Sequence, residues 1–158
     1  MNQDAYSELC RNTCLILGIT DIDSLANQGY LSIDGINIQL VFDEILSNDR
    51  ILCVCEIGTV KASIKEKIFE SLLMLNFLTG SKTSGVFAID PISQCVSFVV
   101  TLINPESLTA DRLADLLKCY ASRNLYLQKT LFLNGDLPFA IDVENPDSDS
   151  IKHNLHLA

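Results

Sequence analysis

The sequence is poor in basic residues. Only 11 lysines and arginines stand against 20 aspartates and glutamates, and the formal net charge is -9. Phosphate backbones and anionic lipid surfaces attract proteins of the opposite sign. Uninterrupted apolar runs are also short, because stretches such as 72–75 and 98–100 fall far below the roughly 20 residues that cross a bilayer as a helix. We therefore expect no nucleic acid among the partners and no membrane insertion.

Motifs for catalysis and metal binding are scarce as well. The two histidines, His153 and His156, have no Cys or acid spaced to complete a tetrahedral metal set. Residues 80–83, Gly-Ser-Lys-Thr, echo the end of a phosphate-binding loop, but they follow a predicted helix instead of opening one. Neither a nucleophile elbow nor a metalloprotease helix occurs. We therefore predict no enzyme, no catalytic or metal-binding residue, no nucleotide and no cofactor.

The six cysteines are the remaining reactive side chains. Residues 1–8 are polar and acidic and do not form a secretory or transit signal, so we expect a cytosolic protein. In that reducing compartment thiols behave mostly as small buried apolar groups. Cys53 and Cys55 lie two residues apart on a predicted strand, so both thiols point to one face. A thiol enzyme that uses Cys53 or Cys55 is the alternative to core thiols.

Apolar residues are 48% of the 158-residue chain, enough for one compact core. Their spacing predicts runs of strands interrupted by single helices, and Asp34-Gly35 is typical of a two-residue hairpin turn. The order, α-β-β-β-α-β-β-α, indicates an α+β fold with helices packed on a twisted antiparallel sheet. The predicted elements are a helix at 4–17, strands at 30–33, 36–42 and 50–57, a helix at 62–79, strands at 85–90 and 94–103, and a helix that begins after a cap at Ser107 or Thr109 and ends near 128.

Two segments carry more apolar side chains than a single small sandwich can cover. Residues 72–78 are apolar around nearly the whole circumference of the predicted helix. Residues 98–103 are apolar on both faces of a strand, although a small antiparallel sheet usually keeps one face wet. A symmetric partner subunit is the simplest cover. We therefore expect a homodimer that binds another polypeptide.

Several short motifs occur along the chain in a telling order. They are Leu-Gly-Ile at 17–19, Leu-Ser-Ile-Asp-Gly at 31–35, Leu72-Leu73 with Asn76, and Gly-Val-Phe-Ala-Ile-Asp-Pro at 85–91, followed by an amphipathic last helix. Together they resemble the class I type III secretion chaperones, the Tir-chaperone family of Gram-negative bacteria, from about residue 6 to residue 127. The resemblance implies a homodimer in the bacterial cytoplasm. Such a dimer would bind the N-terminal chaperone-binding segment of a secreted effector in extended form and keep it secretion-competent.

The same resemblance implies the positions of two binding surfaces. About half of the effector-binding positions are expected to be ordinary core. The alternative function is a dimeric roadblock-type regulatory scaffold, which would bind folded partners instead of an unfolded segment. The implied effector-binding residues are Leu9, Ile16, Ile33, Ile38 and Leu40. The implied dimer-interface residues are Leu72, Leu75, Phe98, Val100 and Leu102.

The end of the chain differs from the rest in composition. We divide the sequence into a chaperone-like domain at 1–130 and an acidic C-terminal tail at 131–158, because residues 134–150 hold five acids and no base. Within the tail, apolar residues alternate with others over 137–143, which is strand periodicity. Two interpretations stay open: this segment imitates a client at an edge strand or groove, or the tail is an unstructured solubilising segment.

Overall fold

The computed structural model describes residues 1–79 and 85–134. The predicted α+β class and the order α-β-β-β-α-β-β-α are confirmed. The predicted loop at 80–84 and both interpretations of 137–143 lie outside the described residues. The main elements are α1 (Gln3–Leu17), β1 (Tyr30–Ile33), β2 (Ile36–Val41), β3 (Arg50–Thr59), α2 (Lys65–Thr79), β4 (Gly85–Ile89), β5 (Cys95–Ile103) and α3 (Ala110–Asn134), with short helical turns at Ser24–Gln28, Ala62–Ile64 and Pro105–Ser107.

The five strands form one antiparallel sheet in the order β1-β2-β3-β5-β4. The predicted hairpin turn is confirmed, since Asp34 (φ 52°) and Gly35 (φ 83°) both have positive φ and Ile33 pairs with Ile36. A two-residue turn of this type requires positive φ at both central positions, which glycine adopts without strain. Strands β1 and β4 are the two edges of the sheet.

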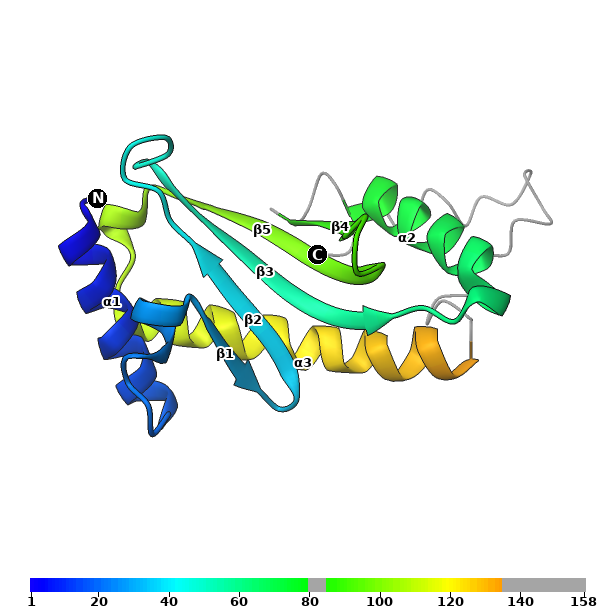
Figure 1. Ribbon diagram of the computed structural model, residues 1–158, viewed down its shortest axis with the longest axis horizontal. Helices are drawn as coiled ribbons and strands as arrows, with labels where there is room; N and C mark the ends of the chain where they lie inside the picture. Colours follow the sequence, from blue (N-terminus) through cyan, green and yellow to red (C-terminus); the bar gives the residue numbers. More distant parts are fainter. Residues whose placement is uncertain (80–84, 135–158) are drawn as a thin grey trace, which may run out of the picture.

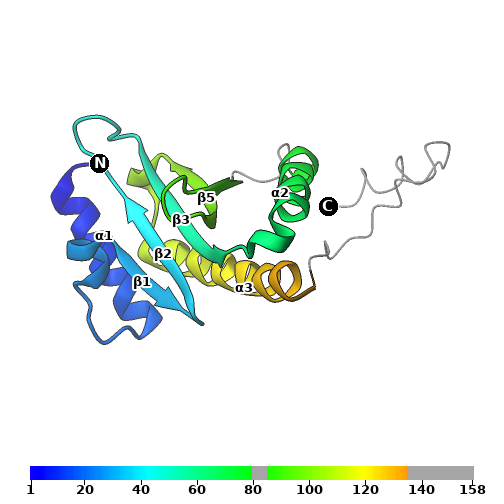
Figure 2. The ribbon, with the colours of Figure 1, turned by 45° about the vertical axis from the view of Figure 1, so that its right-hand side comes forward.

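Helices α1 and α3 cover one face of this sheet (Figures 1 and 2). Strand β2 alternates strictly, with Ile36, Ile38 and Leu40 buried and the residues between them exposed. The hydroxyl of Tyr6 on α1 donates to the carbonyl of Leu40 at 3.3 Å, which ties the helix to this strand. The core is therefore a single layer between the sheet and these two helices, and none of the described helices packs on the opposite face, which we call the open sheet face.

Helix α3 ends at Asn134, six residues beyond the predicted end. The amide of Gln128 donates to the carbonyl of Ile57 at 2.5 Å, and the neighbouring Leu127 is buried. These contacts join residues that are far apart in the sequence, so the helical periodicity could not predict that the helix continues beyond residue 128. The long helix crosses β1, β2 and β3 and also packs on α1.

Strand β3 contains a bulge near its end. Glu56 pairs with Ser97 of β5 and Gly58 pairs with Val96, so Ile57 has no opposite residue. A bulge leaves one residue outside the ladder and bends the strand. The Ile57 carbonyl, which the bulge leaves outside the ladder, accepts a hydrogen bond from the side-chain amide of Gln128 instead.

Helix α2 lies beside the outer edge of β4 rather than on a sheet face (Figure 1). The side-chain amide of Asn76 donates to the carbonyl of Phe87 at 3.0 Å and accepts from the N–H of Phe87 at 2.7 Å. One side chain thus replaces a neighbouring strand at this position. The arrangement fixes α2 and closes part of the β4 edge.

Candidate protein-binding surfaces

The two thiols considered for catalysis, Cys53 and Cys55, do not form an accessible nucleophilic site. Cys53 and Cys55 are fully buried, with their Sγ atoms 4.0 Å apart, so a substrate has no route to either. The hydrogen bond to Cys55 and burial raise the pKa of Cys53, which keeps it a neutral thiol. Burial likewise raises the pKa of Cys10 to about 12. Within residues 1–79 and 85–134, His, Cys, Asp and Glu side chains form no group that could hold a metal ion.

The described part of the chain exposes apolar side chains and unpaired strand edges. No helix in the described ranges is long and apolar enough to span a bilayer. Four surfaces stand out on the subunit: the β1 edge, the outer side of α2, the open sheet face and a groove between β5 and α3.

The β1 edge presents free main-chain groups. Ile33 and Ile36 flank the two-residue turn and form a hydrogen-bonded pair, so the next pair, Ser32 and Asn37, does not exchange main-chain hydrogen bonds. The hydrogen bond from the N–H of Leu40 to the carbonyl of Gly29, 2.7 Å, agrees with this alternation. The N–H and C=O groups of Tyr30 and Ser32 therefore point away from β2. In the described part of the chain no residue pairs with them, and an extended peptide can add to this edge.

Exposed apolar side chains accompany this edge. Leu15 and Ile16 are exposed at the end of α1, Tyr30 is exposed on β1, and Ile33 is half-buried. The turn at Ser24–Gln28 packs against both α1 and β1 and joins the two elements. An extended segment with alternate apolar side chains fits such a surface, because the strand pairs the backbone and the neighbouring side chains contact every second residue.

The five implied effector-binding residues divide between surface and core. Ile16 is exposed and Ile33 is half-buried, so both are accessible to a peptide. Leu9 on α1 and Ile38 and Leu40 on β2 are buried in the core between the helices and the sheet. Sequence reasoning did not select Leu15 and Tyr30. The alternation of β1 and β2 could have selected Tyr30, because it pairs with Gln39 on the polar face of the hairpin.

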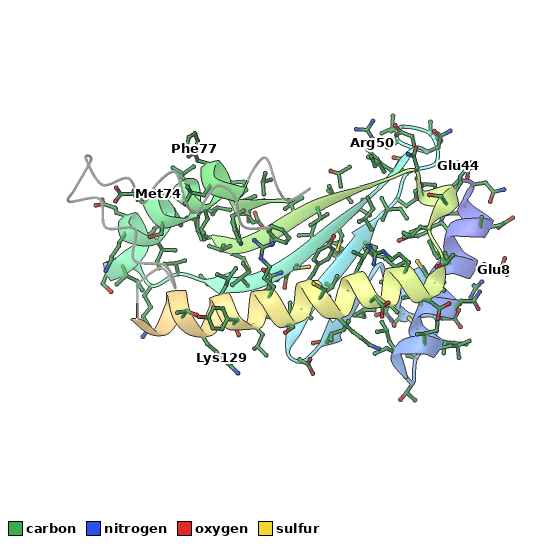
Figure 3. The ribbon with its side chains drawn as sticks, turned by 180° about the vertical axis from the view of Figure 1, so that it is seen from behind. Glu8, Glu44, Arg50, Met74, Phe77 and Lys129 are labelled. Carbon is green, nitrogen blue, oxygen red and sulfur yellow. The ribbon has the colours of Figure 1, made fainter. Side chains whose placement is uncertain are left out.

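The outer side of α2 carries an apolar cluster of Leu73, Met74, Phe77 and Leu78, which we call the α2 patch. Phe77 is 87% exposed and Leu73 is 70% exposed. Figure 3 shows Phe77 projecting from α2 away from α3. The four side chains surround a shallow hollow of about 390 Å³ with almost no polar lining. A monomeric protein rarely leaves such a cluster in water.

The five implied dimer-interface residues lie just beneath the surface. Leu72 and Leu75 form the inner side of α2, and Phe98, Val100 and Leu102 face the helical layer from β5. All five are buried within the single chain, whereas the α2 patch is exposed. The signal for this difference was present in the sequence: Ile68, Leu72 and Leu75 share one helical stripe, which leaves 73 and 77 on the opposite side.

The open sheet face carries both polar and apolar side chains. One row across it runs through Tyr30, Gln39, Val54, Val99 and Val86. Val54 and Val99 are half-buried, while Val86 is exposed. The prediction that β5 carries apolar side chains on both faces is therefore correct at Val99, whose face no described helix covers.

A groove lies where the end of β5 meets the start of α3. It has a volume of about 320 Å³. Strand β4 pairs with β5 only from Val96 to Val100, so it does not reach the last three residues of β5. The groove is lined by Thr101, Leu102, Ile103, Asn104, Ser107, Leu108, Arg112, Leu116 and Tyr120.

Solved structures share this fold. A chain of the ExsC–ExsE complex matches with a TM-score of 0.67 at 15% identity, over 84% of this chain and 97% of that chain. A chain of the HopA1–SchA chaperone–effector complex matches with a TM-score of 0.52 at 16% identity, over 80% of this chain and 92% of that one. No protein-family model and no curated protein matches the sequence. Over most of its length, the chain therefore shares the fold of a chain in the ExsC–ExsE complex and of a chain in the HopA1–SchA chaperone–effector complex.

Proposed function

We propose that this protein is a chaperone of the bacterial cytoplasm that binds the N-terminal chaperone-binding segment of a type III secreted effector. The segment is held extended and secretion-competent, and the chaperone acts as a homodimer without nucleotide, cofactor or catalysis. The observation that carries the proposal is the match to SchA, which is a chaperone in a chaperone–effector complex. The match to the ExsC–ExsE complex, with its higher TM-score, supports the same assignment.

The β1 edge provides a physical basis for binding an unfolded client. A peptide that adds to this edge would exchange main-chain hydrogen bonds with Tyr30 and Ser32. Its alternate side chains would contact Ile16 and Ile33, the two accessible members of the implied effector-binding set. Ordering an extended client costs conformational entropy, so a long contact track is needed. Two subunits would supply two such tracks.

The α2 patch is the surface that we assign to the dimer. Leu73 and Phe77 lie on the side of α2 opposite its buried stripe, and a two-fold axis through this helix would cover both at once. The homodimer thus rests on exposed side chains rather than on those in the core.

A proline at the β1 edge tests the client site. Ser32→Pro removes an N–H that points away from β2, so the β1–β2 ladder stays intact while strand addition is blocked. The matched control is Ser32→Ala, which keeps that N–H. Each tagged variant is expressed in the native bacterium, and co-purified proteins are identified by mass spectrometry. We expect an effector whose N-terminal segment resists limited proteolysis in the complex.

The two Ser32 variants should differ in the amount of effector that co-purifies with them. Ser32→Pro should lose the effector by at least tenfold, and Ser32→Ala should retain it. Capture of a folded partner that Ser32→Pro does not affect would contradict the proposal and favour the roadblock-type scaffold.

A charge on α2 tests the dimer. Phe77→Glu should convert the dimer to a 17.4 kDa monomer in sedimentation velocity. Ile45→Glu is the matched control, because Ile45 is also almost fully exposed but lies in the β2–β3 loop. A wild-type monomer at micromolar concentration would contradict the dimer assignment.

A further inference from the structure

The groove between β5 and α3 combines a free strand edge with an apolar floor. Phe87 accepts and donates its main-chain hydrogen bonds on the Asn76 side, so Phe87 and Phe98 do not exchange them across β4 and β5. By alternation, odd-numbered residues of β5 direct their N–H and C=O groups toward the β4 side. Thr101 and Ile103 therefore present main-chain groups where β4 has already ended. Among the described residues, none pairs with them.

One side of α3 adds charge to this groove. Arg112, Leu116, Tyr120 and Arg123 recur at helical spacing and form a stripe along the flank of α3 that faces β5. Arg112, Leu116 and Tyr120 line the groove. The guanidinium of Arg123 lies 4.9 Å from the ring centre of Phe98, and the Phe98 ring packs edge-on against Tyr120 at 6.0 Å. The groove therefore suits an extended segment that is both apolar and acidic.

We propose that this groove binds residues 137–143 of the same chain as an added strand. The segment and the sequence around it carry the complementary chemistry. Leu137, Phe139, Ile141 and Val143 alternate, and Asp142 and Glu144 are acidic. Residues 134–150 contain five acids and no base, while Arg112 is the one charged side chain among the described residues that line the groove.

The length of the chain beyond α3 agrees with this placement. Figure 1 shows α3 beginning near the end of β5 and ending below α2. At about 1.5 Å per residue, Asn134 lies about 21 Å from Tyr120 and about 33 Å from Arg112 along the axis. An extended chain advances about 3.3 Å per residue, so one that turns back along α3 places residues 140–141 beside Tyr120 and residue 144 beside Arg112. Ile141 and Val143 thus lie along the stretch that carries Leu116 and Tyr120. Glu144 is the first residue beyond the added strand, so its side chain is not held to the strand's alternation and can turn toward Arg112.

The added strand would cover the last exposed part of the β5 edge, which protects the subunit from edge-to-edge association. This inference does not depend on the proposed function, because its test needs no effector. Hydrogen exchange at the Thr101 and Ile103 amides is measured in the full chain, since strand addition hydrogen-bonds these amides and slows their exchange.

Tail variants release the segment without touching the groove. The double variant Phe139→Asp, Ile141→Asp places two charges on the face of the segment that contacts α3. We expect exchange at Thr101 and Ile103 to accelerate at least tenfold. The matched control, Pro138→Asp with Ala140→Asp, adds the same two charges on the opposite face of an extended segment and should leave exchange within twofold of the wild type.

A charge reversal tests the arginine. Arg112→Glu should accelerate the same two amides, and Glu144→Arg in that background should restore their protection. Lys118→Glu, on another side of α3, is the matched control and should have no effect. Equal exchange in the wild type and in the Phe139, Ile141 variant would overturn the proposal. Protection that disappears on hundredfold dilution would also overturn it, because a second copy would then occupy the groove.

Discussion

The Asn76 amide offers a sharp test of how α2 is held against the sheet. Asn76→Ala removes both hydrogen bonds to Phe87 and leaves its N–H and C=O at a partly buried edge. Each bond contributes about 1 kcal/mol net, so we expect a loss of about 2 kcal/mol. Because about 1.4 kcal/mol corresponds to a factor of ten, the Phe87 amide should exchange about thirtyfold faster if β4 opens locally.

Asn76→Asp separates the two bonds. The carboxylate keeps an acceptor for the Phe87 N–H but turns a second oxygen toward the Phe87 carbonyl, so amide protection should persist while the free energy of unfolding falls. Asn37→Ala is the control, since it removes one exposed side-chain hydrogen bond to Glu56. Hydrogen exchange and urea unfolding measure the outcomes. Unchanged exchange of the Phe87 amide in Asn76→Ala would refute the reasoning.

Three further predictions concern the core. Gly85→Ala should cost about 1–3 kcal/mol in urea unfolding, because the new Cβ would lie 2.4 Å from Cζ of Phe98; an unchanged midpoint would contradict this packing. The pKa of Cys10 is raised in the folded state from 9.0 to about 12, so its contribution to stability is complete below about pH 9 and is lost as pH rises toward 12. Between pH 8 and pH 11 the free energy of unfolding should therefore fall less steeply for Cys10→Ala than for the wild type. Parallel falls in the two proteins would exclude the effect. Asn124→Leu should raise the free energy of unfolding by about 1 kcal/mol, because both amide atoms of Asn124 are buried and among the described residues they have no hydrogen bond of good geometry beyond a weak contact with the thiol of Cys55; a decrease would show that this contact satisfies the amide.

Local chemistry made most of the architecture predictable. The β1–β2 hairpin follows from Asp34-Gly35 and from the alternation of Ile36, Ile38 and Leu40, which are properties of neighbouring residues. The end of α3 was not predictable in the same way, because the contact between Gln128 and Ile57 joins residues far apart in the sequence. The bulge in β3 likewise has no signal in the period of that strand alone.

For the candidate surfaces, the sequence identified elements rich in apolar residues but not which of their side chains face outward. The surplus of apolar residues in 72–78 is real, yet a helix that is apolar all round does not reveal which side is inside. Leu72 proved to be core and Phe77 surface, because Asn76 fixes the rotation of α2 against β4. For the early strands, burial of Ile38 follows from the covering helices, whereas the free β1 edge depends on the order of all five strands.

The bulge at Ile57 constrains how this chain can diverge. Side chains on a strand alternate between faces, so one inserted or deleted residue reverses every position that follows until the strand ends. Here the extra residue has already made that reversal, and the path into α2 depends on it. The connection between β2 and β3 can change length without reversing a strand face, but an alignment gap of a single residue at 56–58 would reverse the faces of the residues that lead into α2. A relative without the bulge must compensate elsewhere in the same connection.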